Sequence, residues 1–226
     1  RKPVVEIMYD ALGATLQLAF FGWIFATFLG VPLGVLSAVK RGSVWDYLGR
    51  SVALMGQTLP VFWVGIMGIL IFAVKLDWLP VGTRPEEFSF KHFIMPAITL
   101  GWFSAAGYLR LTRSAMLDVM DSEYIKLARA KGVNATAVLW KHAFRNAIIA
   151  PLTFSSLVLA GFITGAIVTE TVFSWPGLGR LAFSSVDDND FPVMVGLMLL
   201  FTFMFLVVNL LTDILYAYVD PRIRYG

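Results

Sequence analysis

Five long runs without a charged residue limit what this chain can fold into. They cover residues 11–39, 51–74, 93–109, 146–169 and 191–212. A helix needs about 20 predominantly apolar residues to cross a bilayer, and the runs are close to or above that length. The composition agrees, because 58% of the residues are hydrophobic and only 15% are charged, which is too little charge for the surface of a soluble domain. We predict an all-α fold, a polytopic transmembrane helical bundle with five spans in a single domain over residues 1–226.

The third run is the shortest of the five. We expect Arg110 and Arg113 to lengthen it by extending their charged ends to the lipid headgroups. Five spans place the two ends of the chain on opposite sides of the membrane, and the chain opens on Arg1 rather than on Met. We therefore expect a further span that precedes this sequence.

Lys and Arg are divided unequally between the loops on the two sides. One side has 12 of these residues and the other has 6, which together make the 18 in the chain. The richer side is cytoplasmic by the positive-inside rule, and it includes residues 110–146 and the C-terminal residues 220–226. The expected outward segments are residues 75–92 and 170–190. Tryptophans are common at the membrane interface, and those expected near the outer edge are Trp78, Trp102 and Trp175.

The basic loop over residues 114–146 separates the third run from the fourth. Before Gly132, Ala and Leu alternate with Lys and Arg at helical spacing, and residues 135–144 again have an amphipathic pattern. We predict a helix, a turn at Gly132 and a short second helix, all held at the membrane surface. Binding of anionic lipid headgroups would explain the sign of the charge. It would not explain the break or the apolar cluster Val138-Leu139-Trp140.

Six strings carry a more specific signal. They are Lys40-Arg-Gly-Ser43, Arg110-Leu-Thr-Arg-Ser114, Ala128-Arg-Ala-Lys-Gly132, His142-Ala-Phe-Arg-Asn146, Glu170-Thr-Val-Phe-Ser-Trp-Pro-Gly-Leu-Gly-Arg-Leu181 and Asp220-Pro-Arg222. In this order they resemble the permeases of binding-protein-dependent ABC importers, and most of all the dipeptide/oligopeptide/nickel branch. The resemblance covers nearly the whole chain. It implies a type I ABC importer permease-like fold and a membrane subunit that does no covalent chemistry of its own.

The resemblance also implies a role for the basic loop. In this family the loop docks on a cytosolic ATPase subunit and transmits nucleotide-driven closure to the membrane helices. The family's general consensus has Glu six residues before the glycine, where this chain has Lys126, and whether Glu123 takes that place is open. The residues that the resemblance assigns to coupling are Glu123, Ala128, Arg129, Ala130, Lys131, Gly132, His142, Arg145 and Asn146.

The segment over residues 170–190 contains a turn-forming string with an aromatic anchor. Two interpretations of it are open. One is a plain re-entrant turn at the membrane interface. The other, implied by the resemblance, is an outer gate or a contact to the external binding protein, carried by Glu170, Trp175, Pro176, Gly177 and Gly179.

Polar side chains within the runs are few. In hydrocarbon such groups face protein or water, so they are candidates for the transport path, although hydrogen bonding between helices is an alternative explanation. The candidates for the path are Gln57, Thr58, Ser155 and Asn209. Gly56, Gln57 and Pro60 further predict an irregularity in the second run.

The sequence lacks a Gly-x-x-x-x-Gly-Lys-Ser/Thr string, so we expect no P-loop for ATP phosphates. We also recognise no catalytic residues and no metal ligands. The resemblance implies that partner subunits bind ATP and Mg. The partners that it implies for this chain are a second homologous permease subunit, two cytosolic P-loop ATPases, an extracytoplasmic solute-binding protein and membrane lipid, with no nucleic acid. The expected location is the plasma (inner) membrane of a bacterium or archaeon.

Peptides are the expected cargo, while nickel and glutathione stay open because the permeases for them share these motifs. The competing function is a stand-alone secondary carrier or channel. That class predicts an inverted repeat or ion-coupling carboxylates inside the membrane. We find no convincing repeat, and no acidic residue lies well inside a predicted span.

Overall fold

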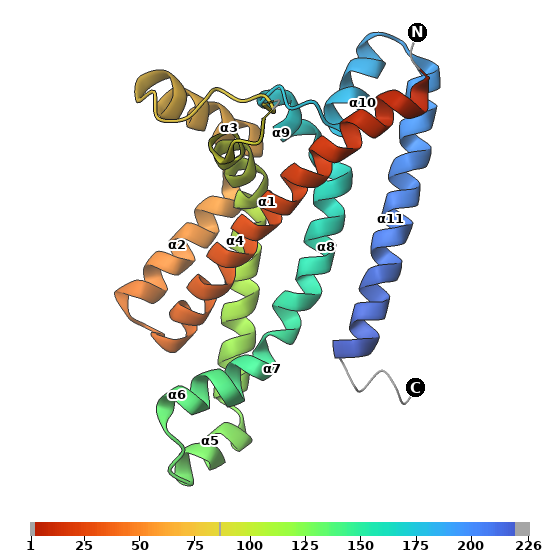
Figure 1. The fold of residues 1–226 in the computed structure, drawn as a ribbon. Coiled ribbons are helices and arrows are strands. Elements are labelled where there is room, and N and C mark those ends of the chain that lie inside the picture. The colour runs from red at the N-terminus through yellow and green to blue at the C-terminus, as the bar shows by residue number, and fades with distance from the viewer. Residues whose placement is uncertain (1–2, 86, 220–226) are drawn as a thin grey trace. The chain divides into compact units, whose positions relative to one another are not determined.

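The computed structural model describes residues 3–85 and 87–219, and every regular element within them is a helix, as Figure 1 shows. The elements are α1 (Val4–Val39), α2 (Val44–Thr58), α3 (Val61–Gly68), the π-helix η1 (Ile69–Lys75), α4 (Phe90–Met120), α5 (Glu123–Ala130), α6 (Ala135–Ala137), the π-helix η2 (Val138–Phe144), α7 (Arg145–Ala147), α8 (Ile149–Gly165), α9 (Ile167–Val172), α10 (Leu178–Asp187) and α11 (Phe191–Val219). The predicted all-α class is confirmed. The string Asp220-Pro-Arg222 lies outside the described residues.

Two described helices are each long and apolar enough to cross a membrane, namely α1 and the Phe191–Thr212 part of α11. Two broken pairs of helices pass the same test when their halves are combined, Val44–Thr58 with Val61–Lys75 and Ala135–Ala147 with Ile149–Thr164. The described part of the chain therefore has two candidate spans, or up to 4 if each broken pair is one span. The five-span count stays a prediction.

The irregularity that we predicted in the second run is present. Helix α2 ends at Thr58 and α3 begins at Val61, and the residue at the N-cap of α3, Pro60, is extended with φ −62° and ψ 137°. Proline has no amide hydrogen to donate and disfavours helical backbone at the residue before it. It therefore separates the two helices.

The helices contribute to two compact units. Unit 1 contains residues 1–25, 59–102 and 157–211, and unit 2 contains residues 26–58, 103–156 and 212–226. In unit 1, α9 packs against both α3 and α10, and in unit 2, α5 packs against η2, as can be followed in Figure 1. The prediction of a single domain over residues 1–226 stays a prediction.

In unit 2, α1 and α4 approach each other through glycines of α1. A Cβ atom on Gly30 would lie 2.5 Å from the carbonyl oxygen of Ala105, and one on Gly34 would lie 2.7 Å from the carbonyl oxygen of Leu109. Because lipid tails are as apolar as the side chains, helices in a membrane associate by close packing rather than by the hydrophobic effect. The two glycines permit that packing.

Helix α2 of unit 2 buries its small side chains and exposes its large ones. Gly49, Ala53 and Gly56 are buried, whereas the exposed side chains include Val44, Trp45, Leu48, Leu54 and Met55. A helix on a water-soluble protein usually has the opposite arrangement. The pattern suits a helix whose outer face lies against lipid.

An ion pair inside unit 2 ties α2 to α4. The Asp46 side chain is 1% exposed and accepts two hydrogen bonds from Arg113, at 2.8 Å from Nε and 3.1 Å from Nη2. It also accepts from the Ser37 hydroxyl at 2.7 Å and from the Gly42 amide at 2.9 Å. The prediction that Arg113 extends to the headgroups is therefore wrong, because its guanidinium is needed to compensate this buried carboxylate.

The centre of unit 1 is aromatic. The rings of Phe93 and Trp175 meet edge to face with centroids 4.8 Å apart, and Phe21 approaches Phe93 at 4.7 Å. Trp175 is 0% exposed, and its indole N–H donates to the carbonyl oxygen of Ala14 at 3.0 Å. We expected Trp175 to be an interfacial aromatic, and this expectation is wrong because the ring is fully covered by the protein.

The glycines of α1 provide a direct test of the packing. We expect Gly30→Ala to destabilise the protein by about 1–3 kcal/mol, the usual cost of overpacking, because the added methyl meets backbone. Gly13→Ala in the same helix is the matched control, since a Cβ atom there has nothing within 4 Å and Ala is the better helix former by about 1 kcal/mol. Thermal unfolding of both variants in detergent measures the difference. Equal melting temperatures would contradict the packing role of Gly30.

Candidate functional site

The basic loop folds into a compact piece, which we define as the α5–α7 segment (residues 123–147). Gly132 adopts φ +78°, a left-handed conformation that glycine enters without a steric penalty, and the predicted turn at this residue is confirmed. Asn134 then caps α6, because its side-chain oxygen accepts a hydrogen bond from the Ala137 amide at 2.7 Å. A second break, at Asp121–Ser122 between α4 and α5, was not predicted.

Apolar contacts fix α5 against the rest of unit 2. Ile125 is fully buried in a cluster with Met116, Val138 and Ala143, and Ala128 packs against the same cluster. Among the predicted coupling residues, Ala128 is thus half-buried and faces the protein interior. Its side chain helps to hold the segment together.

Hydrogen bonds join the two ends of the segment. The Tyr124 hydroxyl donates to the carbonyl oxygen of His142 at 3.2 Å. The Asn146 side-chain amide donates to the Tyr124 hydroxyl at 3.1 Å and to the same His142 carbonyl at 2.8 Å. The sequence alone gave no indication of this triad. It connects α5 with η2 and α7, so the segment is held as one piece.

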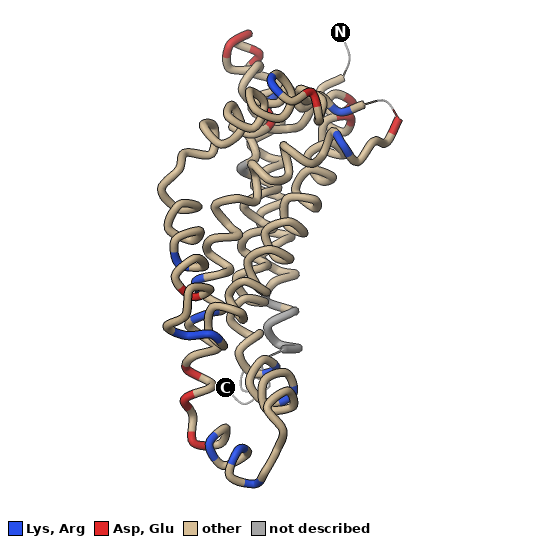
Figure 2. The backbone as a smooth tube through the Cα atoms, turned by 90° about the vertical axis from the view of Figure 1, so that its left-hand side faces the viewer, with Lys and Arg blue, Asp and Glu red and all other residues tan. Residues whose placement is uncertain are grey.

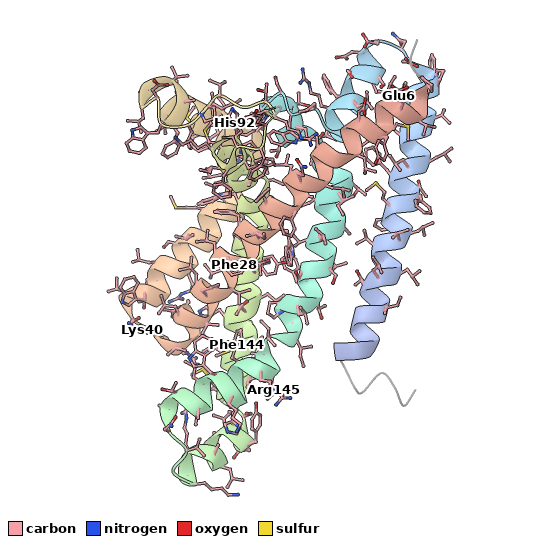
Figure 3. All side chains as sticks on the ribbon, in the orientation of Figure 1. Glu6, Phe28, Lys40, His92, Phe144 and Arg145 are labelled. Carbon is pink, nitrogen blue, oxygen red and sulfur yellow. The ribbon has the colours of Figure 1, made fainter. Side chains whose placement is uncertain are left out.

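Of the remaining predicted coupling residues, His142 is half-buried and the others are exposed. Figure 2 shows basic residues along α5 and the turn after it, and in Figure 3 the labelled Arg145 lies where η2 continues into α7. The side chain of Glu123 is 89% exposed and pairs with Lys126 at 2.7 Å. The exposed set consists of Glu123, Arg129, Ala130, Lys131, Gly132, Arg145 and Asn146.

A second candidate site is the turn over residues 170–180, in unit 1, which we call the Glu170 turn. Glu170 is fully buried. Its Oε1 accepts a hydrogen bond from the Thr15 hydroxyl at 2.7 Å, and its Oε2 accepts from the Arg180 amide at 2.9 Å. The Thr15 hydroxyl oxygen in turn accepts from the Leu178 amide at 2.8 Å. One carboxylate thus joins α1, α9 and α10.

The Glu170 side chain caps the N-terminus of α10. That helix begins after Gly177, which has no side chain to satisfy the free amides of the first turn. The carboxylate fills this role from a distance in the sequence, and its negative charge suits a helix N-terminus. Burial raises the pKa of the Glu170 carboxyl, while hydrogen bonds from Thr15 and from the amides of Arg180 and Gly179 act in the opposite direction.

Both glycines of this turn are required by close approach. A Cβ atom on Gly177 would collide with the Glu170 carboxylate, and one on Gly179 would lie 2.7 Å from the Cα of Ile167. Of the five residues predicted here, Glu170, Trp175, Gly177 and Gly179 are buried and Pro176 is exposed. The side chains of Glu170 and Trp175 are therefore covered by this chain and do not offer a surface to a partner.

The four candidates for a transport path have ordinary surroundings. Gln57 accepts a hydrogen bond from Arg110 Nη1 at 3.0 Å, and the Thr58 hydroxyl donates to the carbonyl of Leu54 at 3.0 Å in its own helix. Ser155 is buried and Asn209 is half-buried. The contacts of Gln57 and Thr58 fit hydrogen bonding within the protein. A role in the path stays a prediction for all four.

Sequence reasoning missed the buried carboxylate Asp46 and missed Thr15, the partner of Glu170. Thr15 was not noticed, because a threonine in an apolar run is unremarkable until its neighbour is known. Asp46 was missed because it lies among basic residues in a short connection. The one available signal was an acidic residue next to an apolar run, as at Glu170. Among the described residues, no group of three or more His, Cys, Asp or Glu side chains is placed to hold a metal ion.

Comparisons with known proteins identify a family. The family model for the binding-protein-dependent transport system inner membrane component matches residues 30–225. The dipeptide transport system permease protein DppB of Alkalihalophilus pseudofirmus is 40% identical, over 99% of this chain and 75% of that protein. DppB of Escherichia coli K12 is also 40% identical, over 100% and 75%. The glutathione transport system permease protein GsiC of Salmonella paratyphi A is 42% identical, over 100% and 72%.

Solved structures agree on the fold. A chain of the MetNI methionine ABC transporter, in an inward facing conformation, has a TM-score of 0.78 with 97% of this chain and 99% of that chain covered. A chain of an amino acid ABC transporter crystallised with histidines has a TM-score of 0.74, with 95% and 94% covered. The sequence identities are only 17% and 15%, so these two structures show the fold alone. The predicted importer-permease fold is confirmed.

The Glu170 turn leads to a stability prediction. Glu170→Ala removes the acceptor of the Thr15 hydroxyl and of the Arg180 amide, and each buried donor left without a partner costs about 1–3 kcal/mol. We expect a clear fall in melting temperature and faster proteolysis within residues 170–190. Glu123→Ala is the control, because that carboxylate is exposed and its ion pair is worth less than about 1 kcal/mol. Equal effects of the two substitutions would contradict the role given to Glu170.

Proposed function

Because this chain belongs to the family of binding-protein-dependent transport system inner membrane components, we propose that it is the permease subunit of an ATP-driven importer for di- or oligopeptides. The names of its relatives, dipeptide and glutathione permeases matched over almost the whole of this chain, support a peptide cargo. The structural observation that carries the proposal is the α5–α7 segment, a rigid and basic piece with a left-handed glycine at its tip.

The α5–α7 segment suits the transfer of a mechanical signal. Its exposed surface carries the basic side chains, while Ile125 and the Tyr124–His142–Asn146 hydrogen bonds hold its helices together. A partner that moves the exposed face therefore moves the whole segment, and α4 and α8 continue from its two ends. Coupling of this kind needs two states that both sites bias. The two states are the two orientations of the membrane helices, and closure of the ATPases favours one of them.

The energy source lies in partner subunits. Since the sequence has no P-loop string, ATP and Mg are held by two cytosolic ATPases, and the α5–α7 segment docks on one of them. The excess of Lys and Arg supports a cytoplasmic position for this segment and the C-terminus. A second, homologous permease subunit completes the membrane path, and an extracytoplasmic solute-binding protein delivers the cargo.

The Glu170 turn lies on the outward side in this arrangement. Because Glu170 and Trp175 are buried, they contribute to an outer gate by fixing α1, α9 and α10 to one another. Pro176 is exposed at the turn. Of the five residues predicted for this contact, it is therefore the one available to touch the external binding protein.

Isolation of the native complex tests the proposed function. The tagged chain is purified from its own membrane in a gentle detergent, and the proteins that accompany it are identified by mass spectrometry. We expect P-loop ATPases and a second, similar permease. Recovery of the chain alone, still able to move solute into liposomes without ATP, would replace this proposal with the stand-alone carrier.

Coupling through Gly132 makes a sharper test. A Cβ atom at Gly132 has nothing within 4 Å, so a substitution there acts through backbone strain, about 1–2 kcal/mol for a residue in the left-handed region. We expect Gly132→Val to lower ATP-driven peptide uptake by roughly tenfold, because a turn that changes shape to relieve this strain reduces the population of the docking-competent segment by about that factor. Gly132→Asn should retain most of the uptake because Asn tolerates this conformation. Uptake is measured in proteoliposomes that contain all partner subunits.

Gly42→Val is the matched control for this experiment. Gly42 has φ +77° and also has nothing within 4 Å of a Cβ atom, so it suffers the same strain outside the α5–α7 segment. We expect this variant to lose stability without losing uptake per inserted complex. Equal loss of uptake in the Gly42 and Gly132 variants would show that strain in general, rather than coupling, is responsible.

A further inference from the structure

A cleft of about 610 Å³ lies beside the Glu170 turn in unit 1. Its charged and polar lining comes from three segments that are distant in the sequence: Asp10 of α1, Arg84 of the connection before α4, and Arg180 and Ser184 of α10. Sites for small ligands commonly have volumes of roughly 300–1,000 Å³. Two guanidinium groups and one carboxylate therefore line a space large enough for a small solute.

Arg180 is held in place by the Glu170 turn. Its backbone amide donates to Glu170 Oε2 at 2.9 Å, and its Nη1 donates to the carbonyl oxygen of Ser174 at 2.6 Å. A guanidinium has five N–H groups in a fixed fork, so one bond to Ser174 fixes the group and leaves donors for a ligand. The cleft wall on this side is thus rigid and still able to bind an anion.

Arg84 is held against the same turn. The Thr83 amide donates to the carbonyl oxygen of Phe173 at 2.9 Å, and a Cβ atom on Gly82 would lie 2.6 Å from that oxygen. Arg84 itself is half-buried and forms no ion pair with any residue that the structure describes. A half-buried guanidinium that is paired with no described carboxylate favours a ligand that supplies an anion.

Asp10 gives the cleft a negative group. This carboxylate already has an interaction in the structure, and a carboxylate has about four acceptor positions, so it can take a further donor. We propose that the cleft binds the zwitterionic main chain of a short peptide. The terminal carboxylate lies at Arg84 and Arg180, and the terminal ammonium lies at Asp10. This inference rests on the proposed peptide importer and adds to it a binding site on the permease.

The charges of the cleft discriminate between classes of ligand. An inorganic anion would gain from the two arginines but would be repelled by Asp10, and a simple cation would meet two positive groups. An apolar molecule would cover these charged groups without offering any of them a partner. A peptide with free ends satisfies both signs, and arginine binds a carboxylate through two parallel hydrogen bonds.

Direct binding tests the inference without the external binding protein. The probes are radiolabelled alanyl-alanine and its C-terminal amide, added to the complete membrane complex in nanodiscs. We expect the free acid to bind more tightly than the amide. Arg84→Gln should weaken binding of the free acid by about tenfold, the size expected for one charge-assisted pair, and leave the amide unchanged. Lys91→Gln, at an exposed residue in the first turn of α4, is the matched loss of positive charge and should change neither.

Two further variants keep the test decisive. Arg84→Lys retains the charge but lacks the planar fork, so it should lose only part of the preference for the free acid. Asp10→Asn should weaken binding of alanyl-alanine and leave its N-acetyl derivative unaffected. Melting temperatures of the variants show whether they are folded.

Several outcomes would overturn the inference. One is equal binding of acid and amide by the unmodified complex, and another is an unchanged preference in Arg84→Gln. A third is that Arg84→Gln weakens docking of the external binding protein and leaves dipeptide binding as it was, which would make the cleft a protein contact. Peptide import that continues in any of these cases would leave the proposed function intact while removing this site.

Discussion

Close backbone approach between α1 and α4 is the contact on which the packing of unit 2 depends. Gly30 and Gly34 leave no room for a methyl group against the carbonyl oxygens of α4, and α2 joins the same pair through Gly49, which lies against Ser37. A membrane offers no hydrophobic force between helices, so this fit has to come from shape and van der Waals contact. The consequence is visible on α2, where the small residues are inside and the large apolar residues are outside. The helices come close to one another because glycine at the contact has no side chain.

Two buried carboxylates add hydrogen bonds between specific segments, which packing alone does not provide. Asp46 collects donors from α1, from the turn at Gly42 and from α4, while Glu170 collects them from α1 and from the start of α10. Each lies at a place where the chain reverses direction and where backbone amides have no partner inside a helix. At Gly177 the reason is direct, because the cap residue has no side chain and the Glu170 carboxylate occupies the space where one would be. A buried charge is weak evidence for stability in itself. Here its value is that it specifies which segments meet.

The parts of the fold that the sequence predicted are those with local causes. Uncharged runs predict helices because hydropathy and helix formation are properties of neighbouring residues, and the breaks at Pro60 and Gly132 follow from the backbone chemistry of single residues. The errors concern partners that are far away in the chain. Trp175 was expected at the interface because it lies near a predicted outer membrane edge, but the carbonyl of Ala14 gives its indole a buried acceptor. Arg113 was expected at the headgroups because it follows the shortest apolar run, and its actual partner is 67 residues away. Hydropathy along one segment contains no information on either contact.

The strings that resemble the family, where they fall within the described residues, lie at places where the structure fixes the backbone. Gly42 donates to Asp46, Arg113 closes the same ion pair, Gly132 makes the left-handed turn, Asn146 bonds to Tyr124, and the residues after Glu170 wrap around its carboxylate. The lipid-facing surfaces have no comparable requirement, because any large apolar side chain suffices there. Two chains can therefore share this fold at low sequence identity, as this protein and a chain of the MetNI transporter do, with a TM-score of 0.78 at 17% identity. The backbone arrangement depends on few contacts, concentrated at turns and helix crossings, and most of the remaining positions need only be apolar. Recognition by sequence therefore depends on the connections between helices.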